Sequence, residues 1–209
     1  TQLILGPHMV AVDMAGTEFY YWMAAYPEEC HKLLNKITEA CFAAEDLARK
    51  IDPRFRGGFA LAEDSSTILS ANMFKEMVVP YTKRCYERYG KGLQFGRGLH
   101  MCGPSTHLLD VLADDLQITD FNVFGCPVAP EDAARKLGGK TCLWGNIDPV
   151  LMKDGTKEEV KAACMRALKA MAPCGGFMLG DGANVCPGTP LENIRVFAEA
   201  AEEFGVPDG

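Results

Sequence analysis

Three residues with side chains suited to binding a soft metal ion stand out: His100, Cys102 and Cys186. His100 and Cys102 close an apolar run, Leu93–Leu99, that predicts a strand, and ligands at i and i+2 of a strand end point the same way. Cys186 follows a second such run, Phe177–Leu179. One imidazole and two thiolates suit Zn²⁺, and three protein ligands leave one coordination position for chemistry. The alternative is that this His-x-Cys arises by chance in a chain with nine cysteines.

Other polar residues follow predicted strands and are further candidates for a site. Asp64 is the carboxylate expected near the metal, because it follows the strand immediately before the His-x-Cys strand. Asn146 and Asp148, in Gly-Asn-Ile-Asp-Pro, either contact substrate or only make a turn and begin a helix. Cys126 competes with Cys186 as the third thiolate. We expect one face to gather the catalytic candidates Asp64, Asn146 and Asp148, the substrate-binding candidates His8, Asp13, Glu63 and Asn122, and the metal ligands His100, Cys102 and Cys186.

Six short apolar runs alternate with helical patterns and therefore predict six βα units. The predicted strand–helix pairs are Leu3–Leu5 with Pro27–Lys50, Gly58–Ala62 with Met73–Tyr89, Leu93–Leu99 with Ser105–Ala113, Ile118–Phe124 with Pro130–Leu137, Thr141–Trp144 with Glu158–Met171, and Phe177–Leu179 with Leu191–Phe204. No Gly-x-Gly-x-x-Gly follows the first run, which argues against a dinucleotide-binding sheet. Functional-looking residues after nearly every strand favour part of a (β/α)8 TIM barrel, whose active sites lie at the carboxyl ends of its strands.

Because a full barrel needs two more strands and this chain opens on a bare strand, we expect the missing units to be N-terminal. The 209 residues, 48% of them hydrophobic, suit one domain over residues 1–209. The net charge of −7 and the scattered basic residues argue against a nucleic-acid partner. No apolar run reaches the roughly 18 residues that cross a bilayer. Cysteines inside helical patterns are typical of a reducing cytoplasm.

Several motifs together resemble the uroporphyrinogen decarboxylase superfamily of (β/α)8 barrels. They span essentially the whole chain in a specific order: Gly6-Pro, Ser70 to Pro80-Tyr81, His100-Met-Cys102-Gly103, Gly145-Asn-Ile-Asp148-Pro149, Gly155-Thr-Lys-Glu-Glu-Val160 and Cys186-Pro-Gly-Thr-Pro-Leu-Glu-Asn193-Ile. The resemblance implies that roughly the first third of a family member is absent from this chain.

The resemblance is strongest to the branch of methylcobamide:coenzyme M methyltransferases, whose zinc ligands fall on His100, Cys102 and Cys186. It implies a zinc-dependent methyltransferase that moves a methyl group between a corrinoid and a thiol or small methylated substrate. Zinc lowers the pKa of the bound thiol, so that the nucleophilic thiolate forms at neutral pH. The corrinoid is expected to arrive on a partner protein.

Two alternatives remain open. A metal-independent decarboxylase of a porphyrinogen is the first, although Asp13 stands where that branch has Tyr and Ala183 stands near its late His. The second is a barrel that binds a tetrapyrrole or corrinoid without catalysis.

Overall fold

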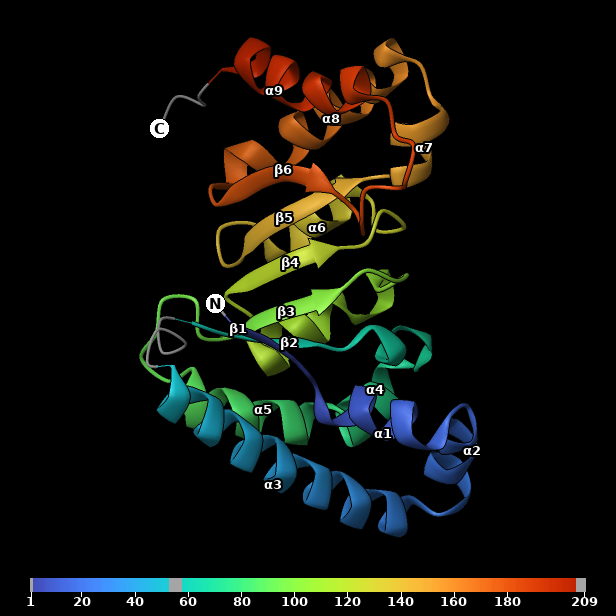
Figure 1. Cartoon of the computed structure of the whole chain (residues 1–209), viewed down its shortest axis with the longest axis vertical. Coiled ribbons are helices and arrows are strands. Elements are labelled where there is room, and N and C mark those ends of the chain that lie inside the picture. The colour runs from blue at the N-terminus through green and yellow to red at the C-terminus, as the bar shows by residue number, and fades with distance from the viewer. Residues whose placement is uncertain (1, 53–57, 206–209) are drawn as a thin grey trace. The chain divides into compact units, whose positions relative to one another are not determined.

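The chain forms an α/β structure of six parallel strands with helices between them, here in a computed structural model (Figure 1). The structure describes residues 2–52 and 58–205. Internal contacts divide the chain into two compact units, which are described in turn. Unit 1 contains Thr1–His100 and Asp110–Thr119, and unit 2 contains Met101–Leu109 and Asp120–Gly209. The parallel βα units confirm the predicted fold class.

In unit 1 the strands β1 (Gln2–Leu5), β2 (Phe59–Ala62) and β3 (Gly98–Met101, of which Met101 is counted with unit 2) pair in parallel, with Leu5 beside Ala62 and Ala62 beside His100. β2 is buried along its whole length, as a central strand covered on both faces should be. The other elements are α1 (Pro7–Ala15), α2 (Glu18–Ala25), α3 (Pro27–Ile51), η2 (Asp64–Ile68), α4 (Ala71–Met77), α5 (Val79–Tyr89) and the π-helical turn η4 (Val111–Leu116).

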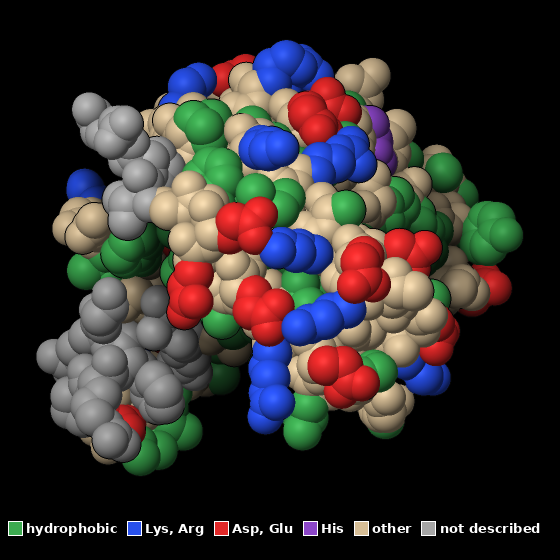
Figure 2. Space-filling view, turned by 90° about the horizontal axis from the view of Figure 1, so that it is seen from above, with side chains coloured by type: hydrophobic (Ala, Val, Ile, Leu, Met, Phe, Trp, Pro, Cys, Tyr) green, Lys and Arg blue, Asp and Glu red, His purple; other side chains and the backbone are tan. Residues whose placement is uncertain are grey.

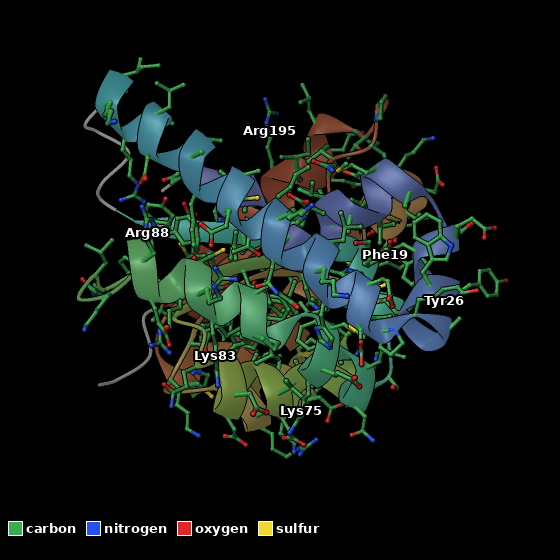
Figure 3. The ribbon with its side chains drawn as sticks, turned by 90° about the horizontal axis from the view of Figure 1, so that it is seen from below. Phe19, Tyr26, Lys75, Lys83, Arg88 and Arg195 are labelled. Carbon is green, nitrogen blue, oxygen red and sulfur yellow. The ribbon has the colours of Figure 1, made fainter. Side chains whose placement is uncertain are left out.

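Helix α3 begins at Pro27, a residue that fits the first turn because its missing N–H has no partner there in any helix. Its buried stripe includes Leu34 and Ile37, and its outer face is polar. Figure 3 shows α3 beside α5, to which it is joined by the ion pair of Arg88 with Asp46, 2.7 Å between Nη2 and Oδ2. Tyr26, just before α3, extends away from the ribbon and is exposed.

In unit 2 the strands β4 (Asp120–Phe124), β5 (Cys142–Ile147) and β6 (Phe177–Asp181) pair in parallel. The aromatic pair Phe121 and Phe124 is fully buried. The other elements are α6 (Pro130–Leu137), α7 (Pro149–Asp154), α8 (Lys157–Met171), α9 (Leu191–Phe204) and the 3₁₀ turns η3 (Thr106–Leu108) and η5 (Ala172–Cys174).

Helices α8 and α9 pack together and expose charged faces. Lys157 pairs with Glu199, 3.1 Å between Nζ and Oε1, and Lys161 pairs with Glu203 at 2.5 Å. Figure 2 shows basic and acidic side chains interleaved over the face seen from above, with neither sign forming a continuous area there. This face is a solvated helical surface.

The structure corrects several predicted elements. The helix predicted over Met73–Tyr89 is two helices, because Pro80 lacks the N–H that would continue α4 into α5. The strand predicted over Leu93–Leu99 begins only at Gly98, because a turn rich in glycine precedes it. The helix predicted over Ser105–Ala113 is instead a 3₁₀ turn followed by the π-helical turn η4. Two helices, α1 and α2, were not predicted at all.

Candidate metal centre

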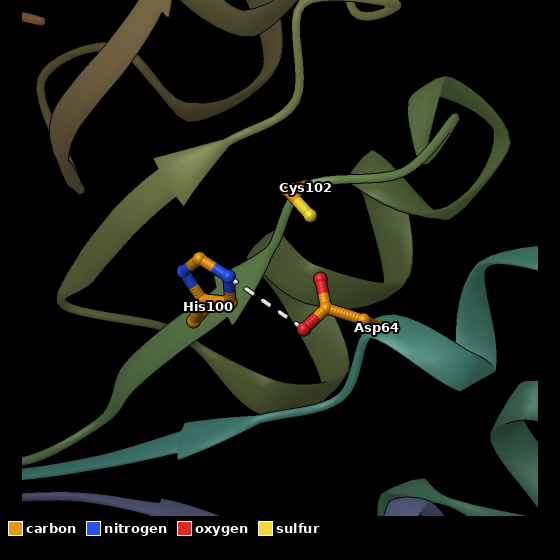
Figure 4. A group of neighbouring side chains, drawn as sticks. All are labelled: Asp64, His100 and Cys102. Atoms are coloured by element: carbon orange, nitrogen blue, oxygen red, sulfur yellow. Dashed lines mark ion pairs between the residues drawn. The ribbon is translucent and has the colours of Figure 1, made fainter. Parts of the chain in front are cut away.

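The ends of β2 and β3 bring together a carboxylate, an imidazole and a thiol. One ligand atom from each of Asp64, His100 and Cys102 lies within 4.8 Å of the other two (Figure 4). The Oδ2 atom of Asp64 is 3.6 Å from Nε2 of His100, and these side chains are 28% and 20% exposed. Among residues 2–52 and 58–205, no other three His, Cys, Asp or Glu side chains come together in this way. The group is therefore ordered by the sheet and accessible from solvent.

Strand pairing explains this arrangement. Ala62 lies beside His100 in the parallel register, and the N–H of Glu63 extends the pairing by donating to the carbonyl oxygen of His100, 3.0 Å away. Asp64 then begins the turn η2, so its carboxylate leaves the sheet at the level of His100. Cys102 follows β3 by one residue and stays in reach of the same point. The carboxyl ends of neighbouring parallel strands thus supply all three groups.

The three side chains offer one nitrogen, one sulfur and one oxygen donor. Zn²⁺ accepts all three donor types, whereas Mg²⁺ and Ca²⁺ select oxygen ligands. The residues present therefore fit a zinc ion. Cys186, the ligand predicted from sequence, lies half-buried in the loop after β6, where its carbonyl oxygen accepts a hydrogen bond from Oγ1 of Thr189 at 2.8 Å. It is not one of the three grouped residues.

Two residues predicted to bind substrate are sealed inside unit 1. His8 and Glu63 have fully buried side chains, and both contact the hydroxyl of Ser66 at 2.9 Å. His8 is the second residue of α1 rather than part of a loop at the strand end. Asp13 also lies in α1, and its side chain is exposed. His8 and Asp13 therefore lie in a helix and not in a loop, because Pro7 starts a helix directly after β1.

In unit 2, Asn146 and Asp148 perform structural tasks. The buried amide of Asn146 lies inside β5, one strand residue beyond Gly145, and donates to the carbonyl oxygens of Gly125 and Val128 at 3.3 and 2.6 Å. Asp148 is exposed and caps α7, its Oδ1 accepting from the N–H of Val150 at 2.8 Å. Asn146 was expected after a strand, but β5 continues to Ile147, so the placement is corrected.

Asn122 and Cys126 also belong to this unit. Asn122 lies within β4, half-buried, inside the strand predicted over Ile118–Phe124. Cys126 lines a cavity of about 180 Å³ together with Asn146, Asp148 and Arg166. Burial and then the negative charge of Asp148 raise the pKa of the Cys126 thiol, so its thiolate forms less readily than that of an exposed cysteine.

Sequence reasoning missed two residues at the candidate centre. Ser66 gives no local signal, because its importance arises from contacts with His8, which is distant in sequence. Gly125 follows β4, and a Cβ added there would overlap the carbonyl oxygen of Cys102. A glycine directly after a strand is the one sequence signal that could have indicated this close approach.

Within the described ranges, no helix is both long and apolar enough to cross a membrane.

Comparison with known proteins identifies the family. A methylated-thiol–coenzyme M methyltransferase from Methanosarcina mazei is 26% identical over 211 residues, which cover 98% of this chain and 53% of that protein. A uroporphyrinogen decarboxylase from Danio rerio is 29% identical over 185 residues, covering 86% of this chain and 48% of that protein. The chain thus spans about half the length of these relatives.

A solved structure of a methyltransferase from Methanosarcina mazei superposes with a TM-score of 0.77 at 22% identity, covering 97% of this chain and 58% of that one, which supports the fold. The family model for uroporphyrinogen decarboxylase (URO-D) matches residues 3–204. The chain therefore belongs to the uroporphyrinogen decarboxylase family.

Proposed function

We propose that this chain is part of a zinc-dependent methyltransferase that moves a methyl group between a corrinoid and a thiol or small methylated substrate. The observation that carries the proposal is the group of Asp64, His100 and Cys102 at the ends of β2 and β3. The similarity to a methylated-thiol–coenzyme M methyltransferase supports the same chemistry. The corrinoid is carried by a partner protein, and the enzyme works in the cytoplasm.

His100 and Cys102 are the first two zinc ligands of this proposal, and Cys186 from the loop after β6 is the third. A zinc ion bound there supplies a positive charge that lowers the pKa of a substrate thiol. Sulfur ligands moderate this charge, so that a thiolate stays nucleophilic.

Asp64 serves this site in one of two ways that its position allows. If Nδ1 of His100 bound the metal, the Asp64 carboxylate, 3.6 Å from Nε2, would favour the orientation of the imidazole through its negative charge. With Nε2 on the metal, Asp64 is itself a ligand. In both cases Asp64→Asn removes a negative charge from the site and weakens metal binding.

We assign the remaining candidate residues to substrate contact, to support from the interior of unit 1 or to the shape of a strand end. Asp13 and Asn122 are the candidates for substrate contact, since neither is fully buried. Glu63 and His8 act from the interior of unit 1, where their side chains have no exposed surface. Asn146 and Asp148 shape the end of β5 through their backbone contacts.

The test is the metal content and ligand set of the reduced chain. We expect about one zinc per chain, with His, Cys and carboxylate donors at about 2.0–2.3 Å in zinc-edge X-ray absorption. Two sulfur neighbours, falling to one in Cys186→Ser, support Cys186 as a ligand. Cys174→Ser is the matched control, because its thiol contacts only the carbonyl oxygens of Ala134 and Ala170 among the described contacts.

Activity is assayed by methyl transfer between methylcobalamin and a small thiol, with the chain extended by any residues that precede it in its gene. A reduced protein without metal that still transfers methyl groups at the wild-type rate overturns the proposal.

A second candidate function is decarboxylation of a porphyrinogen, which the similarity to uroporphyrinogen decarboxylases favours. Incubation with uroporphyrinogen separates the two functions, because only the decarboxylase releases carbon dioxide and forms a product with fewer carboxyl groups. The Asp and Ala at positions 13 and 183 weigh against this candidate.

A further inference from the structure

Three buried polar side chains from separate segments of unit 1 meet beside the backbone that carries Asp64. Ser66 of η2 lies between His8 of α1 and Glu63, the residue that follows β2. Its Oγ is 2.9 Å from Nδ1 of His8 and 2.9 Å from Oε2 of Glu63. All three residues are 0% exposed. The two contacts join the three side chains into one hydrogen-bonded series.

The single proton of the Ser66 hydroxyl determines which group donates in each of the two hydrogen bonds. A serine hydroxyl has one proton, and that of Ser66 is donated to the carboxylate of Glu63. The other contact therefore has Nδ1–H of His8 donating to Oγ of Ser66. His8 thus holds Ser66, and Ser66 holds the carboxylate of Glu63.

Asp64 lies inside the short loop between Glu63 and Ser66, which the hydrogen bonds between these two residues close. The backbone N–H of Ser66 donates to the carbonyl oxygen of Glu63 at 3.0 Å, so backbone and side chain both join residues 63 and 66. The N–H of Glu63 donates to the carbonyl oxygen of His100 at 3.0 Å. Gly6 lies close to the Glu63 side chain, because a Cβ added at residue 6 would overlap the Glu63 carboxylate. Both ends of the Asp64 backbone are therefore fixed relative to His100.

Folding stability does not by itself explain this cluster. Nε2 of His8 and Oε1 of Glu63 are buried without a hydrogen-bond partner among the described residues. Burying polar groups with unfilled hydrogen-bonding capacity disfavours folding. Apolar side chains at these positions would serve folding better. A function that depends on the position of the loop with Asp64 explains why polar side chains are present instead.

We propose that Ser66, held by His8 and bonded to Glu63, is a positioning residue that aims the carboxylate of Asp64 at His100. The proposal rests on the metal-binding function proposed above. Hydrogen bonds behind metal ligands typically set affinity by about 10- to 100-fold. Ser66 acts through the loop and not by contact with metal or substrate.

The experiment compares two neighbouring serines. Ser66→Ala removes the bridging hydroxyl, whereas Ser65→Ala removes a buried hydroxyl from the same turn that has no hydrogen-bond partner in the described residues. Ser66→Thr restores a hydroxyl at the position. The readouts are zinc affinity, measured by competition with a chelating dye, and the visible absorption spectrum of the cobalt(II)-loaded chain, which reports ligand geometry.

We expect Ser66→Ala to weaken zinc binding about 10-fold and to shift the cobalt bands. Ser65→Ala should keep the wild-type values, and Ser66→Thr should recover them in part. Glu63→Gln serves as a second test if Ser66→Ala folds poorly, and it should shift the cobalt bands in the same direction.

Failure of this proposal is distinct from failure of the proposed function. If the wild-type chain binds cobalt through Cys102 and Asp64→Asn shifts its spectrum, but Ser66→Ala matches Ser65→Ala, the positioning role is overturned and the metal site stands. If Asp64→Asn leaves the spectrum unchanged, Asp64 is not part of the centre and the positioning role falls with it. If neither cobalt nor zinc binds the reduced wild type, the proposed function fails.

Discussion

Gly125, the residue that follows β4, leaves no space for a side chain beside the carbonyl oxygen of Cys102. The contact joins the ends of two neighbouring segments of unit 2, one of which carries a candidate ligand. The position of Cys102 thus depends on the absence of a Cβ at residue 125.

We predict that Gly125→Ala displaces Cys102 and lowers zinc affinity by about 10-fold or more, the effect typical of disturbing a ligand's support. Gly175→Ala is the control, because Gly175 has a positive φ of 73° but an added Cβ would meet nothing within 4 Å. It should reduce stability through backbone strain and leave zinc affinity unchanged. Equal zinc affinities in the two variants would contradict the prediction.

Asp148 is predicted to matter for stability through its cap on α7. Asp148→Ala should lower the free energy of unfolding by about 1 kcal/mol, measured in urea, because the N–H of Val150 loses its acceptor. Asp148→Asn keeps a capping oxygen and should lose less. A variant Asp148→Ala with wild-type stability but strongly reduced methyl transfer would instead place Asp148 in the chemistry.

Alkaline pH should destabilise the fold through two buried thiols. Burial is the main factor that raises the pKa of Cys85 and of Cys164, each from 9.0 to about 12. The unfolded chain releases these protons above about pH 9 while the folded chain keeps them until about pH 12. Their contribution is therefore complete below pH 9 and is lost as pH rises toward 12.

The measurement for these thiols is the pH dependence of the urea midpoint between pH 8 and the onset of alkaline unfolding, with reductant present. Cys164→Ala should make the fall of the urea midpoint with pH shallower, because one thiol fewer then releases its proton on unfolding. An unchanged slope in Cys164→Ala and Cys85→Ala would show that other groups cause the loss.

The Asn of the closing Leu-Glu-Asn-Ile motif has a structural explanation. Nδ2 of Asn193 is buried and donates to the carbonyl oxygens of Met152 and Gly155, both at 2.9 Å. Asn193→Ala leaves both carbonyls without this donor and should cost about 1–3 kcal/mol of stability. Asn35→Ala, which removes an exposed amide bonded to His31, should cost much less. Equal unfolding midpoints in urea would contradict this explanation.

Local patterns predicted much of the fold and part of the candidate site. The helices Pro130–Leu137 and Leu191–Phe204 were predicted with the bounds that the structure has, because proline and an apolar stripe mark them clearly. Helices α1 and α2 were missed, since apolar residues are spread around both helices and leave no clear apolar stripe at helical spacing.

In the candidate site too, residues with a local sequence pattern were predicted, and a residue without one was missed. The pair His100 and Cys102 is two residues apart, so local spacing was enough to indicate it, and pairing of neighbouring strands was enough to suggest Asp64. Ser66 depends on a contact between residues 58 positions apart in sequence. No local pattern contains that information, because only the folded sheet brings the two segments together.

Nε2 of His8 and Oε1 of Glu63, which have no hydrogen-bond partner among the described residues, lower the stability of the fold. Groups buried without partners lower stability, and sites that need such groups are commonly where natural proteins are less stable than their folds permit. A variant in which apolar residues of matching shape replace both His8 and Glu63 should therefore melt at a higher temperature than one that lacks only a single partner. In the metal site that we propose, selection for heat resistance alone would therefore replace this cluster, and with it the support that we propose for Asp64.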